Sequence, residues 1–185
     1  MDDIVRQAIA KWPNVPDCYG WLGLDARGDW YLRDDAAQAA GAFAGAGAAA
    51  KGSVLRHVQL LAFIGRNYAC DARGCWFFQN GPQRVYVELA LTPWIWRLSP
   101  DLSIRSHTGT AAQFQECLLD EAGRVFLVTD LGLGLVHSLD VELVATAVEQ
   151  GAWVPRPVLA AELPVRYGFV ESPQQLWARG ANAGP

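Results

Sequence analysis

The chain has 185 residues, of which 51% are apolar and 18% charged, and its 15 Lys and Arg against 19 Asp and Glu give a net charge of −4. This apolar content excludes disorder for most of the chain, and the length suits one large domain or two small, tightly packed ones. The acidic balance excludes a strongly basic, duplex-coating protein, so we expect no nucleic-acid partner.

The first predicted element is an amphipathic helix near the N-terminus, capped by Asp2 or Asp3 and ended by Pro13. Its apolar residues share one arc at about 100° per residue, as is typical of a helix with one buried face. They are Ile4, Val5, Ala8, Ile9 and Trp12. The N-terminus lacks the basic start and apolar core of a secretory signal, and no run of about 18 apolar residues could span a membrane. We therefore expect a cytoplasmic protein with no membrane partner.

A turn signature with Asp first and Gly fourth occurs three times, at residues 25–28, 71–74 and 120–123. Between apolar runs it predicts β-hairpins with bulged three-residue loops, whose last residue is left-handed. The three copies are either a true internal repeat or independent uses of a favourable turn. At the second copy, strand alternation puts Cys70 and Cys75 on opposite faces, which disfavours a disulfide. With Cys18 and Cys117, they are predicted to be reduced thiols.

Residues 34–52 are rich in Ala and Gly, and this low complexity predicts a loop insertion with little order or with partial helix. Because Ala and Gly bury little area, deleting residues 36–50 is predicted to leave the melting temperature nearly unchanged. Ser53 is predicted to cap a second helix over residues 54–67. Its apolar positions wrap most of the way round, which indicates a central, buried helix.

The most informative stretch combines a strand at residues 76–79, a turn at 80–83 and a return strand at 84–89. Centring the turn on Gly81 and Pro82 sets the register of the two strands. One face is then apolar and is predicted to be core. It carries Trp76, Phe78, Val85, Val87 and Leu89.

The other face of this hairpin carries the candidate ligand-binding residues Phe77, Gln79, Arg84 and Tyr86. The register places Gln79 opposite Arg84 and Phe77 opposite Tyr86, so a groove between them could bind a small anion. Arg84 offers five donors in a planar fork that suits a carboxylate or phosphate. Glu88 lies about 13 Å along the strand, too far for easy pairing with Arg84. The structural alternative is an aromatic pair packed under a second layer, with Arg84 stacked at its rim.

Further elements are predicted toward the C-terminus. The strands are residues 94–98, 113–119, 125–129 and 133–136, with a short strand near 166–170. A helix over residues 139–150 ends at Gly151, a proline-rich segment covers 155–164, and the tail after Ser172 is expected to fray.

Motifs that carry chemistry are scarce. Residues 45–50 match a dinucleotide fingerprint only formally, because no apolar strand precedes them. There is no phosphate loop, nucleophile elbow or zinc-binding helix motif, so we predict no catalytic residue, metal or cofactor. His57 shares a helical arc with Leu61 and Ile64 and is interpreted as a core residue, whereas His107 lies in a loop and His137 ends a strand.

The segment 76–89, Trp-Phe-Phe-Gln-Asn-Gly-Pro-Gln-Arg-Val-Tyr-Val-Glu-Leu, followed by Thr92-Pro93-Trp94, resembles an uncharacterised proteobacterial family of unknown function. The order of parts is similar to a second uncharacterised bacterial family, whose final strand-rich part ends with Arg and Tyr, here Arg166 and Tyr167. The resemblance implies an α+β fold with repeated hairpin-containing halves, and it brings no activity, cofactor or catalytic residue. The Ala/Gly insertion departs from this layout.

These observations predict an α+β fold of mainly antiparallel sheet built from repeated hairpins, with two or three packed helices. The expected halves are residues 1–99 and 100–185. The predicted function is a non-catalytic module that binds a small anionic ligand or a protein partner, as a monomer or a homo-oligomer. The alternative is a hydrolase that uses His107 or His57 with a carboxylate.

Overall fold

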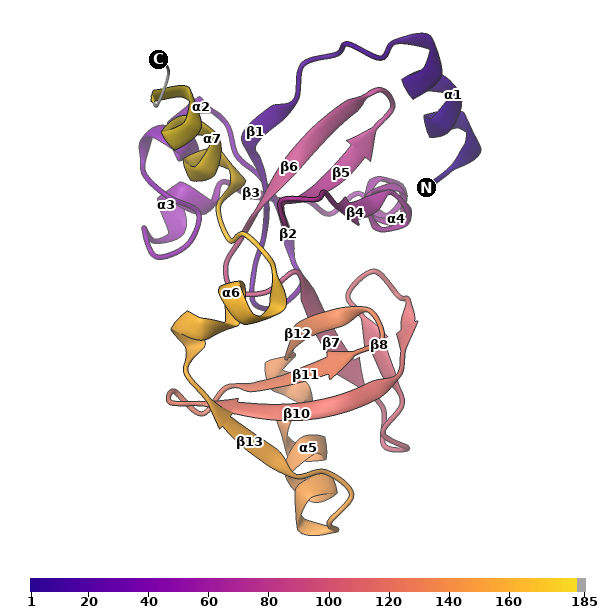
Figure 1. Cartoon of the computed structure of the whole chain (residues 1–185), viewed down its shortest axis with the longest axis vertical. Coiled ribbons are helices and arrows are strands. Elements are labelled where there is room, and N and C mark those ends of the chain that lie inside the picture. The colour runs from indigo at the N-terminus through magenta and orange to yellow at the C-terminus, as the bar shows by residue number, and fades with distance from the viewer. Residues whose placement is uncertain (183–185) are drawn as a thin grey trace. The chain divides into compact units, whose positions relative to one another are not determined.

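The computed structural model describes residues 1–182, which form two mixed, mostly antiparallel β-sheets with helices around them (Figure 1). The α+β class predicted from the sequence is confirmed. The first sheet belongs to a unit made of Met1–Asp25, Asp29–Ala90 and the described residues from Phe169 onward. The second belongs to a unit made of Ala26–Gly28 and Leu91–Gly168. The chain thus leaves the first unit after Ala90 and returns to it at Phe169. The division into domains of residues 1–99 and 100–185 stays a prediction.

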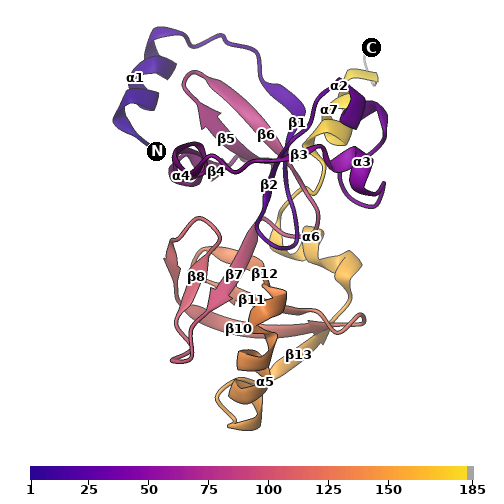
Figure 2. The ribbon, with the colours of Figure 1, turned by 180° about the vertical axis from the view of Figure 1, so that it is seen from behind.

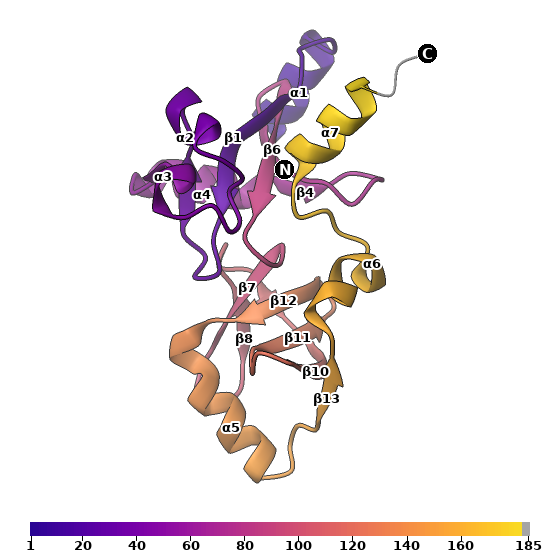
Figure 3. The same ribbon diagram turned by 90° about the vertical axis from the view of Figure 1, so that its left-hand side faces the viewer.

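The first unit holds a six-stranded sheet. Its order is β3 (Ser53–Val54), β2 (Trp30–Leu32), β1 (Cys18–Leu24), β6 (Gln83–Leu89), β5 (Trp76–Asn80) and β4 (Tyr68–Cys70). Its helices are α1 (Asp3–Lys11), α2 (Asp35–Ala39), α3 (Ala48–Lys51), α4 (Val58–Arg66) and α7 (Pro173–Asn182). Only the central β1–β6 pair is parallel. Figure 2 shows α4 beside β4 and β5, and Figure 3 shows α7 along β6.

The second unit holds a seven-stranded sheet. Its order is β13 (Pro155–Val158), β10 (Phe114–Asp120), β11 (Val125–Thr129), β12 (Gly132–Val136), β7 (Trp94–Leu98), β8 (Ile104–Ser106) and β9 (Ala111–Ala112). Its helices are α5 (Val141–Glu149) and α6 (Leu163–Tyr167), with single 3₁₀ turns at Ser138–Asp140 and Ala160–Glu162. The described helices are more numerous than the two or three predicted, although α2, α3 and α6 have only four or five residues each.

The three predicted hairpins are present, and local chemistry explains them. Gly28, Gly74 and Gly123 have φ of 82°, 81° and 75°, the left-handed conformation that a bulged loop requires. In each loop the first Asp accepts backbone N–H bonds with its carboxylate. The Asp71 carboxylate accepts from the backbone N–H groups two and four residues later in the chain, those of Arg73 and Cys75. The Asp120 carboxylate accepts in the same way from Ala122 and Arg124. These contacts lower the pKa of both carboxyl groups, against the burial that would raise it.

The left-handed glycines give a direct test of the hairpin geometry. A Cβ added at Gly123 would meet nothing within 4 Å, so a substitution there isolates backbone strain from steric overlap. We expect Gly123→Val to lower the free energy of unfolding by about 1 kcal/mol, and Gly74→Val, at a buried position, by at least as much. Urea denaturation measures both. An unchanged midpoint for both variants would contradict the left-handed assignment.

The partial helix predicted for the Ala/Gly segment is confirmed, whereas the prediction that the segment is loosely held is wrong, because three of its residues are buried. Residues 35–39 and 48–51 are helical, and Ala37, Phe43 and Ala50 are buried. The organising residue is Arg33, which is fully buried and outside the segment itself. Its guanidinium donates to the backbone oxygens of Gly20, Ala37, Gly41 and Ala50, at 2.6 to 3.3 Å.

The second predicted helix begins later than expected. Ser53 and Val54 form strand β3, and His57 caps α4 by accepting a bond from the backbone N–H of Leu60 at 3.2 Å. The helix is not central, because Val58 is 78% exposed and Ile64 is its one buried residue. The interpretation of His57 as a core residue is therefore wrong.

Two predictions near the C-terminus are also wrong. Residues 163–167 form α6 rather than a strand, and Gly168 ends that helix in the left-handed conformation at φ 65°. The tail does not fray over the described residues, since Pro173–Asn182 form α7. The returning chain is bonded to the first unit: Val170 N–H donates to Gly74 oxygen at 2.9 Å, and Leu89 N–H donates to Glu171 oxygen at 2.8 Å.

The remaining predicted strands are present within one or two residues. Trp94 and Trp96 share a face of β7 as predicted, with ring centroids 5.9 Å apart.

A membrane-crossing helix needs about 20 residues. None of the helices formed by residues 1–182 has the length and apolar character to cross a membrane.

Candidate functional site

The β5–β6 hairpin carries the predicted site residues in the predicted register. Phe77 lies opposite Tyr86 and Gln79 opposite Arg84, so all four share one face of the sheet. Their surroundings differ along the hairpin. The Gln79–Arg84 end is close to the turn, whereas Phe77 and Tyr86 lie deeper, where Phe77 is 5% exposed and Tyr86 is 0% exposed.

Tyr86 is enclosed by neighbours from several elements. Its hydroxyl donates to Asp71 Oδ2 at 3.0 Å and accepts from the Arg73 guanidinium at 3.0 Å. The Tyr19 ring stacks on it at 4.5 Å, and Trp177 of α7 stacks on Tyr19 at 5.4 Å. Burial raises the pKa of Tyr86 to about 12, with Arg84 opposing this effect and the Asp71 carboxylate adding to it. The hydroxyl therefore stays protonated and is engaged within the protein.

Arg84 lies at the rim of this aromatic cluster. Its side chain is exposed, and its guanidinium carbon lies 4.9 Å from the centre of the Phe77 ring. Such a cation–π contact orients a guanidinium, one of whose N–H donors interacts with the Tyr86 hydroxyl, and its planar fork has further donors for a ligand. In residues 1–182, no carboxylate forms an ion pair with Arg84.

Gln79 and Arg84 both line a pocket of about 550 Å³ in the first unit. This volume is within the range of small-molecule sites. The opposite wall is the segment between α1 and β1, which contributes Asn14 and Asp17 as polar groups. The apolar lining residues are Ile9, Pro13, Val15, Pro16 and Pro82. Phe77 and Tyr86 are not lining residues, so the structure brings two of the four predicted residues to the pocket and places Phe77 beneath one of them.

Two side-chain hydrogen bonds fix the walls of this pocket. Gln79 is 3% exposed, and its amide Nε2 donates to the Gly81 oxygen at 2.9 Å across the turn. Gln83 Nε2 donates to the Pro16 oxygen at 3.0 Å and links the α1–β1 segment to the hairpin.

The sequence analysis did not include Asn14 and Asp17 among the candidate site residues. The signal that could have found them is the Pro-Asn-Val-Pro-Asp run at residues 13–17, where two prolines stiffen a segment with polar side chains.

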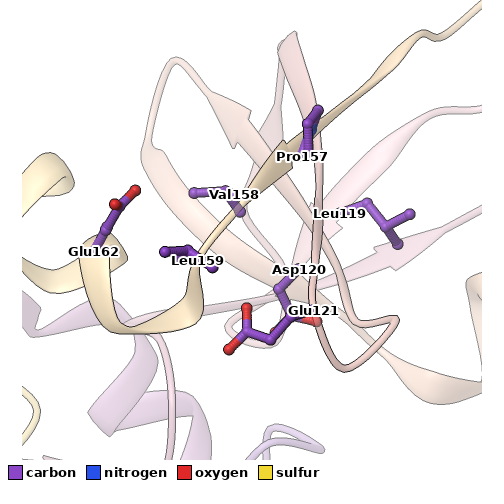
Figure 4. Close-up of a pocket in the computed structure, with 7 residues that line it drawn as sticks. All are labelled: Leu119, Asp120, Glu121, Pro157, Val158, Leu159 and Glu162. Atoms are coloured by element: carbon purple, nitrogen blue, oxygen red, sulfur yellow. The ribbon is translucent and has the colours of Figure 1, made fainter.

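A second pocket, of about 370 Å³, lies in the second unit between β10 and β13 (Figure 4). It combines the apolar side chains of Leu119, Val158 and Leu159 with the carboxylates of Glu121 and Glu162. Glu121 accepts a bond from the backbone N–H of Ala160 at 2.9 Å. This pocket contains none of the predicted site residues.

The histidines of the alternative enzyme hypothesis have structural contacts. His57 is the exposed cap of α4, and His107 Nδ1 accepts a bond from the backbone N–H of Ile95 at 3.3 Å. Burial lowers the pKa of His107 to about 3, so its imidazole is neutral at pH 7. Among residues 1–182, no group of three or more His, Cys, Asp or Glu side chains could hold a metal ion, and all four cysteines are free thiols.

The DUF2944 family model, whose description reads "Protein of unknown function (DUF2946)", matches residues 1–174. The chain belongs to this family. The match covers both sheets and the whole candidate pocket, and the expected resemblance to an uncharacterised family is confirmed.

Members of a second uncharacterised family are similar to this DUF2944 chain in structure. A DUF1285 family protein from Shewanella baltica OS155 has 15% identity and a TM-score of 0.45, with 68% of this chain and 91% of that chain covered. A DUF1285 family protein from Silicibacter pomeroyi DSS-3 has 9% identity and a TM-score of 0.46, with 78% and 83% covered. No curated protein is significantly similar to this chain in sequence.

Proposed function

We propose that this chain is a non-catalytic binding module that holds a small carboxylate-bearing ligand in the pocket beside the β5–β6 turn. The observation that carries the proposal is the state of Arg84. Its guanidinium lines a pocket of about 550 Å³, is oriented by the Phe77 ring, and has no carboxylate partner in residues 1–182. A guanidinium held in this way suits bidentate recognition of a carboxylate.

The contacts of the titratable groups support a binding role rather than catalysis. A general acid or base works best with a pKa near the operating pH. The pKa of His107 is lowered to about 3 by burial, and that of Tyr86 is raised to about 12.

Free thiols at all four cysteines, including the exposed Cys70, support placing the module in the reducing cytoplasm.

The test is titration of the full chain with two monocarboxylate probes, N-acetyl-L-leucine and N-acetyl-L-glutamine, followed by ¹H–¹⁵N correlation spectra. We expect saturable shifts at the backbone amides of Gln79, Gln83 and Arg84 with at least one probe. Arg84→Gln is expected to weaken binding about tenfold or more, because a charge-assisted bond contributes about 1.5–3 kcal/mol and 1.4 kcal/mol corresponds to tenfold in affinity.

The matched control is Arg179→Gln, which removes an exposed positive charge from α7 and should leave the affinity unchanged. Circular dichroism of both variants confirms that they fold. Equal affinity of wild type and Arg84→Gln would overturn the proposal. Absence of saturable shifts with both probes at 20 mM would also overturn it.

A further inference from the structure

Two opposite charges line the candidate pocket from different segments. Arg84 comes from β6, and Asp17 comes from the segment that precedes β1. Both side chains are exposed, and within residues 1–182 neither one forms an ion pair, with the other or with any third residue. The pocket therefore presents a cation and an anion that are both open to a ligand.

The two charges are carried by walls that other contacts fix. Pro16, directly before Asp17, accepts the bond from the Gln83 amide at 3.0 Å, and Gln83 directly precedes Arg84. The Phe77 ring lies under the guanidinium at 4.9 Å. Pro82 restricts the turn itself. Charges on fixed walls lose little conformational entropy when a ligand binds them.

This arrangement favours one charge pattern in the ligand. A dianion such as phosphate would be attracted by Arg84 and repelled by Asp17, so part of its binding energy would cancel. A molecule with one carboxylate and one ammonium group satisfies both side chains: the carboxylate accepts N–H bonds from Arg84, and the ammonium donates to Asp17. The remaining lining, with Ile9 and Val15 beside Asn14 and Gln79, offers apolar and polar surface to a third substituent.

We propose that the pocket takes a free α-amino acid, with its α-carboxylate on Arg84 and its α-ammonium on Asp17. This inference rests on the proposed function, since it assigns the ligand class of the same pocket. It adds a role for Asp17, which recognition of a carboxylate alone does not need.

The test compares free amino acids with their N-acetyl derivatives, which keep the carboxylate and lose the ammonium charge. L-leucine and L-glutamine sample an apolar and a polar side chain. We expect at least one free amino acid to bind about three- to fivefold more tightly than its N-acetyl derivative, a ratio that corresponds to one exposed ion pair of up to about 1 kcal/mol. Asp17→Asn should remove that ratio without weakening the binding of the N-acetyl derivatives, because these anions lose only a repulsion when the Asp17 charge is removed.

Controls separate this inference from the proposed function. Asp29→Asn removes an exposed carboxylate from the β1–β2 turn, away from the pocket lining, and should keep the ratio. If the N-acetyl derivatives bind as tightly as the free amino acids, or if Asp17→Asn keeps the ratio, the amino-acid assignment is wrong while the carboxylate site stands. If Arg84→Gln leaves all affinities unchanged, both are wrong.

Discussion

Replacing Arg33 with Met is expected to lower the free energy of unfolding by about 3–5 kcal/mol, the range seen when one side of a buried charged network is removed. Arg33 is fully buried, and its guanidinium donates to four backbone oxygens that belong to β1 and to the Ala/Gly segment. Met fills a similar volume but donates no hydrogen bond, so these oxygens would be left without their donor.

The measurement is the midpoint of urea denaturation, together with amide hydrogen exchange over residues 34–52. Exchange across that segment is expected to accelerate in Arg33→Met, because its helices are short and depend on this anchor. Arg179→Met, which removes an exposed arginine, should change the midpoint little. A loss of less than 1 kcal/mol in Arg33→Met would contradict the anchoring role. Deleting residues 36–50 should likewise cause a large loss of stability.

Replacing Glu88 with Ala is expected to release α7 and to lower the free energy of unfolding by about 3 kcal/mol. Glu88 is 2% exposed, accepts a short bond from the Ser172 hydroxyl, and accepts from Gln174 N–H at 2.9 Å. The carboxylate thus lies at the N-terminus of α7, where backbone N–H groups and the helix dipole favour negative charge. Trypsin cleavage after Arg179 should become faster when this contact is removed. An unchanged cleavage rate would contradict it.

The charge of Glu88 also gives a pH dependence with a defined sign. Burial raises the pKa of Glu88 above its usual value of 4.5, against the smaller lowering by Ser172, Gln174 and Arg33. The folded state therefore binds this proton more tightly than the unfolded state. The part of the stability that is linked to this proton is fully present below pH 4.5 and is lost as the pH rises through the folded-state pKa, while the hydrogen bonds that Ser172 and Gln174 donate to Glu88 remain. Glu88→Gln should remove this part of the pH dependence, which thermal unfolding at several pH values will show.

Features that depend on neighbours in the sequence could be predicted. The three hairpins follow from Asp and Gly within four residues, because the carboxylate and the left-handed glycine both act inside the loop. The register of β5 and β6 followed from the position of Gly81 and Pro82 in the turn, and it placed Gln79 opposite Arg84.

Features that depend on distant residues could not be predicted. The Ala/Gly segment has weak helix signals of its own, and its order comes from Arg33 and from a core that no local pattern reveals. The same holds for α7, which is stabilised by Glu88 and by the Tyr19 ring, both far away in sequence. The proline run at residues 13–17 marks one wall of the candidate pocket, but its place beside Arg84 depends on the long-range bond between Gln83 and Pro16 and could not be predicted.

One error was avoidable from local signals. A short strand was expected near residues 166–170, yet Pro164 lies in the first turn of α6 and Gly168 ends that helix. Proline near the start and glycine after the end are the usual boundaries of a helix.

The return of the chain to the first unit has a consequence for synthesis. Residues 91–168 form nearly all of the second unit and leave the ribosome as one uninterrupted stretch. Folding of the first unit cannot be completed before Ser172 and Gln174 are synthesised, because these residues donate the hydrogen bonds that the buried Glu88 carboxylate accepts. The later half of the chain is thus expected to fold before the earlier half is complete, because a chain ending after residue 168 would contain every strand of both sheets and would lack α7, the helix that binds Glu88.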